Sequence, residues 1–210
     1  MGSDLLMSRH LVLASASPSR KRLLTAAGVR AEVVVSGVDE ELPEITSLAP
    51  SEMVIALAIL KAHTVKELVP ADSIIVGCDS TFEFDGRSLG KPLTAANAIA
   101  RAQGLRGKSG LLHTGHCVID LQQGIEISDI STSRVYFAQM SDAEIKRYVA
   151  SGEPLNVAGG FTLDGLSSPF IEKIEGCPTG IIGLSLPLLR TAILSLGLSW
   201  SEIAEMDIAS

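Results

Sequence analysis

Two long β-rich segments, 111–120 and 125–138, are separated only by the polar turn Gln122-Gln123-Gly124. Long runs rich in Val, Ile, Thr and aromatic residues, joined through so short a turn, predict an antiparallel β-hairpin. Any sheet that this chain forms should therefore contain an antiparallel part.

The N-terminal part of the chain carries a different pattern. The apolar run 11–14 is followed by a polar turn and then by a segment of helical composition that stops at Gly28. Ser17 is a candidate N-cap of this helix, and Pro18 suits its first turn. Further elements are expected as strands at 31–35 and 73–78 and as helices at 50–69, 94–103, 141–149, 186–196 and 200–206, with an irregular, Gly-rich segment at 152–183. Thr94 is a candidate cap of the helix at 94–103, and Ser141 and Glu144 form a capping-box pattern at the start of the helix at 141–149. Strand–helix alternation combined with a hairpin predicts an α/β fold with a mixed sheet and helices packed on it.

The composition sets limits on the class of protein. With 210 residues, 46% hydrophobic and 20% charged, the chain has enough apolar material for one packed domain spanning 1–210. The formal net charge of -7 argues against a general nucleic-acid-binding protein, which needs a basic surface. A small anionic ligand needs only a few cations in one place, so it stays compatible with this charge.

The remaining global features favour a cytoplasmic protein. Cys78, Cys117 and Cys177 are widely spaced and form no CxxC pair, so we expect buried, reduced thiols and no zinc site. Residues 1–8 belong to a segment without a signal-peptide pattern and are expected to be a disordered lead-in. The apolar stretches are interrupted by Gly, Ser, Pro and Arg, so no membrane span is predicted.

The first candidate for chemistry is the turn 15–22, Ser-Ala-Ser-Pro-Ser-Arg-Lys-Arg. Hydroxyls and backbone N–H groups at the start of a helix form an anion site, and Arg20 or Arg22 can bind phosphate through two N–H groups at once. An ordinary capped helix with a solvated basic face is the alternative for these residue types.

Carboxylates and lysines form the second set of candidates. The acidic loop 39–41 could hold a divalent cation or could simply be solvated. Asp79 is expected at the C-terminal end of the buried strand 73–78, where open α/β sheets place their ligands. Lys61 and Lys91 could supply positive charge to a polyphosphate, although an isolated lysine is usually only solvated. For His113 and His116 we expect structural roles, since no nucleophile or metal-ligand partner is evident near them.

Seven segments, in order and spread over nearly the whole chain, resemble the Maf family of nucleotide pyrophosphatases, the septum-formation-inhibitor proteins. They are LVLASASPSRKRLL at 11–24, VDE at 38–40, ALAILKA at 56–62, IIVGCDSTFEFDGRSLGKP at 74–92, HTG at 113–115, MSDAEIKRYVASGEPLNVAGGF at 140–161 and IEGCPTGIIGLSLPLL at 174–189. The resemblance implies a mixed, curved sheet flanked by helices in two lobes around a cleft, similar to the inosine triphosphate pyrophosphatase fold. It also implies hydrolysis between the α- and β-phosphates of a nucleoside triphosphate, with Mg²⁺ or Mn²⁺, often in a homodimer.

The resemblance also implies roles for particular residues. Ser15, Ser17 and Arg20 fall on the triphosphate-binding loop, Glu40 on a metal-associated acid, Lys61 and Lys91 on phosphate-binding lysines, and Asp79 on the catalytic carboxylate. The mechanistic hypothesis is that Asp79 activates water and holds the metal together with Glu40, while the three cations stabilise the departing pyrophosphate.

Three positions differ from the two branches of the family whose substrates are known, the dTTP/UTP branch and the 7-methyl-GTP branch. Ser19, Ser80 and Asp164 match neither set of residues. Ser80 and Asp164 are expected to contact the substrate, and the acid at 164 could accept hydrogen bonds from a base edge. The base preference therefore stays open between a broad range and modified nucleotides.

Two other functions remain as alternatives. One is a non-enzymatic regulator of cell division that binds a nucleotide or a protein, as the family name suggests. The other is a phosphatase that releases single phosphates. The combination of an acid at Asp79 with several candidate phosphate-binding cations favours catalysis over binding alone.

Overall fold

The computed structural model describes residues 9–205, so the predicted lead-in at 1–8 lies outside the described part. The strands are β1 Leu11–Ala14, β2 Ala31–Val33, β3 Ile74–Phe84, β4 Arg87–Leu89, β5 Ser109–Asp120, β6 Ile125–Phe137 and β7 Ile171–Glu175. The α-helices are α1 Pro18–Ala26, α2 Pro43–Thr46, α3 Pro50–Thr64, α4 Ala95–Leu105, α5 Asp142–Ala150, α6 Pro178–Ile182 and α7 Leu186–Ser195. Short 3₁₀ helices cover Lys66–Leu68, Glu153–Asn156, Ala158–Gly160, Ser168–Phe170 and Trp200–Glu202.

One seven-stranded mixed sheet runs through the molecule, with the strand order β2-β1-β3-β5-β6-β7 and β4 paired with β3. The strands β2, β1 and β3 are parallel, whereas β3, β5, β6 and β7 follow one another antiparallel. The predicted hairpin is the pair β5–β6, and the predicted α/β fold with a mixed sheet is confirmed.

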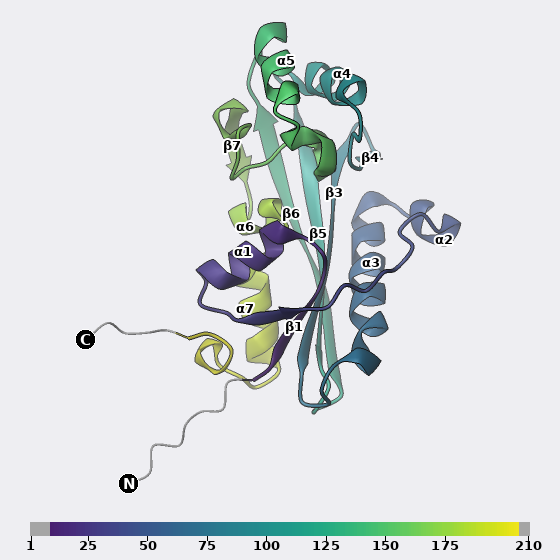
Figure 1. The fold of residues 1–210 in the computed structure, drawn as a ribbon, viewed down its shortest axis with the longest axis vertical. Helices are drawn as coiled ribbons and strands as arrows, with labels where there is room; N and C mark the ends of the chain where they lie inside the picture. The colour runs from purple at the N-terminus through teal and green to yellow at the C-terminus, as the bar shows by residue number, and fades with distance from the viewer. Residues whose placement is uncertain (1–8, 206–210) are drawn as a thin grey trace, which may run out of the picture.

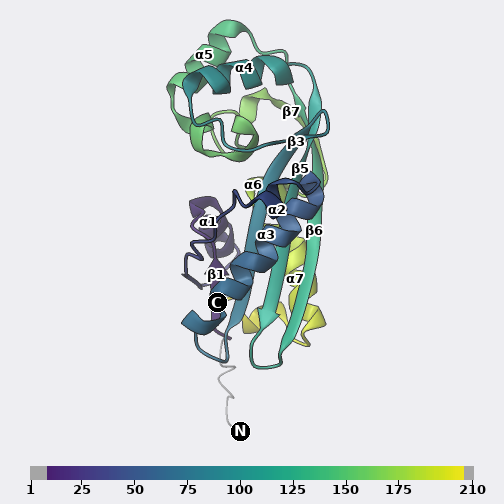
Figure 2. The same ribbon diagram turned by 90° about the vertical axis from the view of Figure 1, so that its right-hand side faces the viewer.

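The helices divide between the two ends of the sheet. Around β1 and the adjoining half of β3, helix α3 lies on one face, and α1 and α7 lie on the other (Figure 1). Helices α4 and α5 gather at the opposite end, near β7, and both views show them apart from α1 and α3 (Figure 2). The long strands β3, β5 and β6 connect these two groups.

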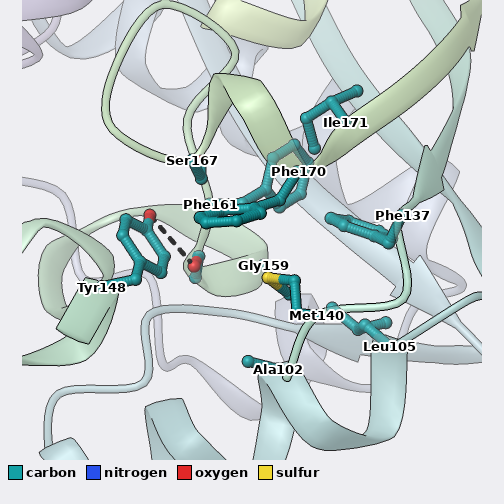
Figure 3. Close-up of a pocket in the computed structure, with 11 residues that line it drawn as sticks. Ala102, Leu105, Phe137, Met140, Tyr148, Gly159, Phe161, Ser167, Phe170 and Ile171 are labelled. Atoms are coloured by element: carbon teal, nitrogen blue, oxygen red, sulfur yellow. Dashed lines mark hydrogen bonds between the residues drawn. The ribbon is translucent and has the colours of Figure 1, made fainter. Parts of the chain in front are cut away.

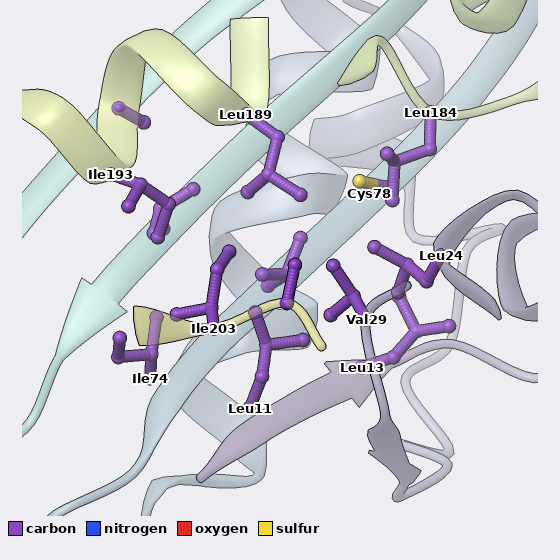
Figure 4. Packing of buried hydrophobic residues seen from close by; sticks show 14 of the residues in the cluster. Leu11, Leu13, Leu24, Val29, Ile74, Cys78, Leu184, Leu189, Ile193 and Ile203 are labelled. Carbon is purple, nitrogen blue, oxygen red and sulfur yellow. The ribbon is translucent and has the colours of Figure 1, made fainter. Parts of the chain in front are cut away.

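The sheet buries a core on each of its faces. One core joins β1, β3, α1 and α7 through side chains such as Leu13, Leu24 and Leu189 (Figure 4). On the other face α3 packs against strands that carry glycine at two contact points. A Cβ on Gly77 would lie 2.2 Å from the carbonyl oxygen of Ala58, and the same close approach occurs at Gly115. Because glycine has no side chain, α3 can lie directly on β3 and β5 at these two points.

Several local predictions are confirmed. Ser17 caps α1 and Pro18 occupies its first turn. Thr94 caps α4 through the backbone N–H of Asn97. Ser141 forms the capping box of α5. Each of these signals depends on neighbouring residues alone, which is why the sequence is sufficient to reveal it.

Other predictions are wrong. The helix expected at 50–69 ends at Thr64 and is followed by a 3₁₀ turn. Only the extended conformation of Val69, directly before Pro70, is explained by the proline. The segment expected to be irregular contains β7, which pairs with the end of β6. The expected helix at 200–206 is a 3₁₀ turn at Trp200–Glu202, and its last residue lies outside the described part.

The prediction that Asp79 ends a strand is also wrong. Strand β3 continues to Phe84, because β5 pairs with it along the whole stretch from Ile74 to Glu83. Asp79 therefore lies in the middle of a long strand.

The three cysteines are free. Cys78 and Cys117 are buried as expected, whereas Cys177 is only partly buried. Between residues 9 and 205, no helix has the length and apolar character needed to cross a membrane.

Candidate active site

The predicted residues gather at a gap in the pairing of β3. On one edge β3 pairs continuously with β5. On the other edge it pairs with β1 as far as Gly77 and with β4 only from Phe82 onward. Within the described chain, residues 78–81 therefore have no strand partner on this edge, and the loop that follows β1 begins beside them.

Arg20 reaches this gap from the first turn of α1. Its Nε donates to the carbonyl oxygen of Gly183 at 2.8 Å, its Nη1 to Ser15 Oγ at 2.7 Å and its Nη2 to Ser80 Oγ at 3.0 Å. Arg20 is only 7% exposed, and no carboxylate in residues 9–205 forms a salt bridge with it. A buried guanidinium that is hydrogen-bonded only to neutral oxygens keeps positive charge without a directly paired carboxylate, which favours binding of an anion.

The serines of this loop fix the position of Arg20. Ser17 caps α1, and its hydroxyl accepts the backbone N–H of Arg20 at 3.5 Å. The hydroxyl of Ser15 accepts both from the Arg20 side chain and, at 3.3 Å, from the backbone N–H of Ser17. The loop therefore holds the guanidinium through its backbone conformation and through one hydroxyl.

Lys61 approaches the gap from the other face of the sheet, on α3. Its Nζ lies 2.6 Å from Asp79 Oδ1 and 2.5 Å from Glu40 Oε1, and its side chain is 8% exposed. Asp79 and Ser80 are consecutive in β3, so their side chains point to opposite faces. Asp79 therefore meets Lys61 on one face of the strand, while Ser80 meets Arg20 on the other.

The charges around this gap influence one another. Burial raises the pKa of Asp79, and the positive charges of Lys61 and Arg20 oppose only part of this rise. Burial would also raise the pKa of Glu40, but the hydrogen bond from Lys61 and the charges of Lys61, Lys91 and Arg20 lower it overall. A carboxylate with a raised pKa beside one with a lowered pKa is typical of sites that move protons.

Lys91 and Asp164 lie at the periphery of this arrangement. Lys91 is exposed in the segment after β4, and its charge reaches Glu40. Asp164 is bound by Arg22, whose Nη2 lies 3.3 Å from the carboxylate and 3.0 Å from Ser19 Oγ. The structure thus places Asp164 next to α1, although no bond connects it to the group around Arg20.

Three residues that hold the site together, Thr114, Gly180 and Gly183, were not among the predicted site residues. Thr114 lies on β5, and its hydroxyl contacts Ser80 Oγ at 2.9 Å and donates to the carbonyl oxygen of Gly180 at 2.8 Å. The carbonyl oxygen of Gly183 accepts from Arg20. Backbone carbonyls carry no signature in the sequence, and Thr114 was visible only within the matching HTG segment.

A pocket at the other end of the sheet is separate from this site. Aromatic and aliphatic side chains from the region around α4, α5 and β7 surround it, including Phe137, Phe161 and Phe170 (Figure 3). Tyr148 points its hydroxyl toward the carbonyl oxygen of Gly160 there, at 3.4 Å. None of the predicted site residues lines this pocket, and the cleft implied by the family resemblance stays a prediction.

The residues at the gap fit a divalent cation only in part. Within residues 9–205, no group of three or more His, Cys, Asp and Glu side chains is arranged to hold a metal ion. Glu40 and Asp79 nevertheless converge on one nitrogen through Oε1 and Oδ1, and their second oxygens accept no hydrogen bond within the described chain. Mg²⁺ commonly uses one or two protein carboxylates together with waters and substrate phosphates, so this pair suits a cation that arrives with a nucleotide.

Both histidines make hydrogen bonds, as expected. His113 lies 2.9 Å from both Thr132 Oγ1 and Glu83 Oε2. His116 Nε2 accepts the backbone N–H of Ser185 at 2.9 Å, directly before α7.

We expect His116 to make the stability of the fold depend on pH. Burial, and then the charge of Arg20, lower the pKa of His116 from 6.5 to about 4. Below pH 6.5 the unfolded chain binds a proton that the folded chain excludes, so stability should fall between pH 6.5 and about 4. The loss should be on the order of 3 kcal/mol, and above pH 6.5 this contribution should be constant.

Urea unfolding of the wild type and of His116→Gln, measured at several values between pH 7.5 and pH 4.5, isolates this contribution. Gln retains an acceptor for Ser185 but does not titrate. The advantage of the wild type in free energy of unfolding should therefore shrink as the pH falls. Parallel curves for the two proteins would contradict the prediction.

The chain is similar to known proteins over most of its length. The family model described as Maf-like protein matches residues 10–196. The chain is 50% identical over 193 residues to a nucleoside triphosphate pyrophosphatase of Salinispora tropica, covering 90% of this chain and 84% of that protein. It is 49% identical over 196 residues to a protein of the same name from Streptomyces coelicolor, covering 93% and 94%.

A solved structure described as nucleoside-triphosphatase / dITP/XTP pyrophosphatase from Mycobacterium abscessus covers 89% of this chain and 94% of its own, with 15% identity and a TM-score of 0.39. A similarity this low does not bear on the function. The match of the family model over most of the chain and the identities near one half are decisive: this chain belongs to the family of Maf-like proteins.

Proposed function

We propose that this protein is a nucleoside triphosphate pyrophosphatase, which hydrolyses the bond between the α- and β-phosphates and releases a nucleoside monophosphate and pyrophosphate. The observation that carries the proposal is the buried Arg20, whose guanidinium contacts only neutral oxygens next to a group formed by Glu40, Lys61 and Asp79. The names of the similar proteins from Salinispora tropica and Streptomyces coelicolor support the same reaction.

The proposed binding step uses the free donors of Arg20. A guanidinium has five N–H groups, and three of them are taken by Ser15, Ser80 and Gly183. The other two are available for phosphate oxygens. Lys91, which is exposed and close enough to influence Glu40, adds further positive charge.

In the proposed chemical step, Asp79 orients a water molecule and accepts its proton as the water oxygen bonds to the α-phosphorus. The bond from the α-phosphorus to the bridging oxygen breaks, and pyrophosphate leaves with the electron pair. Lys61 donates to Asp79 and, with Arg20 and Lys91, offsets the negative charge that develops. Mg²⁺ or Mn²⁺ bound at Glu40 and Asp79 would add positive charge at the phosphate oxygens.

Finer proposals rest on the family resemblance. We propose a homodimer that acts in the cytoplasm, without nucleic acid or membrane as partner, and a link to the arrest of septum formation. For base recognition we propose Asp164, whose carboxylate can accept hydrogen bonds from a base. Arg22 binds this carboxylate, so it would have to share or release Asp164.

Product analysis tests the reaction class. With ordinary and modified nucleoside triphosphates and Mg²⁺ or Mn²⁺, we expect one pyrophosphate for each nucleoside monophosphate. Release of orthophosphate alone would show a phosphatase. Nucleotide binding without turnover across the panel would favour a non-enzymatic regulator.

A further inference from the structure

A buried line of hydroxyl groups connects the candidate phosphate site with the core of the sheet. It runs from Arg20 through Ser80 on β3 to Thr114 on β5, with separations of 3.0 Å and 2.9 Å, and continues to the carbonyl oxygen of Gly180 at 2.8 Å. Thr114 is 0% exposed. Its hydroxyl therefore cannot exchange these partners for water.

The direction of each proton in this line is fixed. Thr114 has one hydroxyl proton, which it donates to the carbonyl oxygen of Gly180, an acceptor only. In the contact between Ser80 and Thr114, Ser80 must therefore be the donor. The lone pairs of Ser80 then face Arg20, whose Nη2 can only donate.

The line also closes into a ring. Gly180 lies within the short helix α6, and Gly183 is the residue that directly follows it. Gly180 accepts from Thr114, while Gly183 accepts from Nε of Arg20. Both ends of the network are thus anchored at α6, so the orientation of the guanidinium depends on Ser80 and Thr114 as well as on its own loop.

We propose that Thr114 is a positioning residue for phosphate binding, and that Ser80 acts with it by orienting Arg20. The hydroxyl proton of Ser80 is committed to Thr114 and its oxygen accepts from Arg20. Ser80 therefore has no donor to offer a substrate. This inference rests on the proposed function, since it assigns Thr114 and Ser80 to the anchoring of the same arginine.

Thr114→Val tests the inference with almost no change in side-chain volume. Valine removes the acceptor of the Ser80 proton, so Ser80 can turn its proton toward Arg20 and displace the guanidinium. We expect KM for the nucleoside triphosphate and Kd for inorganic tripolyphosphate to rise about tenfold. We expect kcat to change less than about threefold, because the variant keeps the charge of Arg20 and loses mainly binding that the ground state and the transition state share. Thr114→Ser keeps the hydroxyl and should restore both constants.

Two further variants separate positioning from a general effect on folding. Ser80→Ala should raise KM by a similar factor, and the double variant Ser80→Ala/Thr114→Val should be little worse than either single variant, because both break the same line. Thr81→Val is the matched control. Thr81 is 2% exposed on β3, and its hydroxyl contacts Ser88 on β4 instead of the site.

Thermal unfolding of every variant accompanies the kinetic and binding measurements. Unchanged KM and tripolyphosphate affinity in folded Thr114→Val, or additive effects in the double variant, would overturn the positioning role while leaving the pyrophosphatase intact. If Thr114→Val does not fold, an unchanged KM in Ser80→Ala would overturn it equally. A wild-type protein that neither binds tripolyphosphate nor hydrolyses any triphosphate would overturn the proposed function and this inference with it.

Discussion

Asp79→Asn should lower kcat by at least about 100-fold while leaving the fold and nucleotide binding largely intact. Asn has nearly the same shape as Asp, and its amide oxygen can still accept the hydrogen bond from Lys61. It cannot take a proton from water. Because burial already raises the pKa of Asp79, the wild-type carboxylate is better suited to accept a proton than an ordinary aspartate.

Single-turnover kinetics with the enzyme in saturating excess over the triphosphate is the appropriate measurement, since it reports the chemical step and not product release. Asp120→Asn provides a matched control. Asp120 is 0% exposed at the far end of β5 and pairs with Arg9 at 2.8 Å, so its substitution should reduce stability without changing kcat. A folded Asp79→Asn protein with near wild-type turnover would refute the role of Asp79 as a base.

The first strand, the loop after it and the capped helix α1 could be predicted because their signals are local. An apolar run, a capping serine and a proline in the first helical turn lie within a few residues of one another. The same locality made Arg20 a visible candidate. The sequence could not show that Arg20 would be buried without a carboxylate partner, since this depends on Ser80 and Gly183, which lie far away along the chain.

The position of Asp79 illustrates the opposite case. An aspartate after an apolar run is typical of the end of a strand, and only the pairing with β5 shows that β3 continues. The consequence for the site is large. Because the strand continues, Asp79 and Ser80 face opposite sides of the sheet, and the site includes groups from both sides of one strand edge. Strand β7 was missed for a similar reason, since its pairing with β6 is non-local.

The wild-type contacts of Lys61 suggest that it serves stability and catalysis together. It is the shared partner of Glu40 and Asp79, and α3 brings it there because Gly77 and Gly115 let the helix lie directly on the sheet. Lys61→Met preserves the length and the apolar part of the side chain. It removes the charge between two carboxylates, one of which is nearly buried.

We expect Lys61→Met to destabilise the fold by about 3 kcal/mol at pH 7, because breaking a buried ion pair from one side leaves an uncompensated charge. Turnover should also fall by at least about tenfold, since one of the cations that we propose to stabilise the leaving group is lost. The variant should have an even higher pKa at Asp79 than the wild type, because Lys61 is the first of the charges that oppose the effect of burial. A protein with a carboxyl group whose pKa is raised in the folded state becomes more stable as the pH falls. The loss of unfolding free energy relative to the wild type, measured by urea unfolding, should therefore be smaller at pH 5 than at pH 7.

The double variant Lys61→Met/Asp79→Asn distinguishes this electrostatic explanation from a loss of packing. Removing both charges eliminates the uncompensated carboxylate, so the double variant should be more stable than Lys61→Met alone and should show no such dependence on pH. If the deficit came from the packing of α3 against the sheet, the second substitution would recover none of it. Equal stability of the single and double variants at pH 7 would therefore show that Lys61 contributes through its alkyl chain, and that Asp79 tolerates burial without its charged partner.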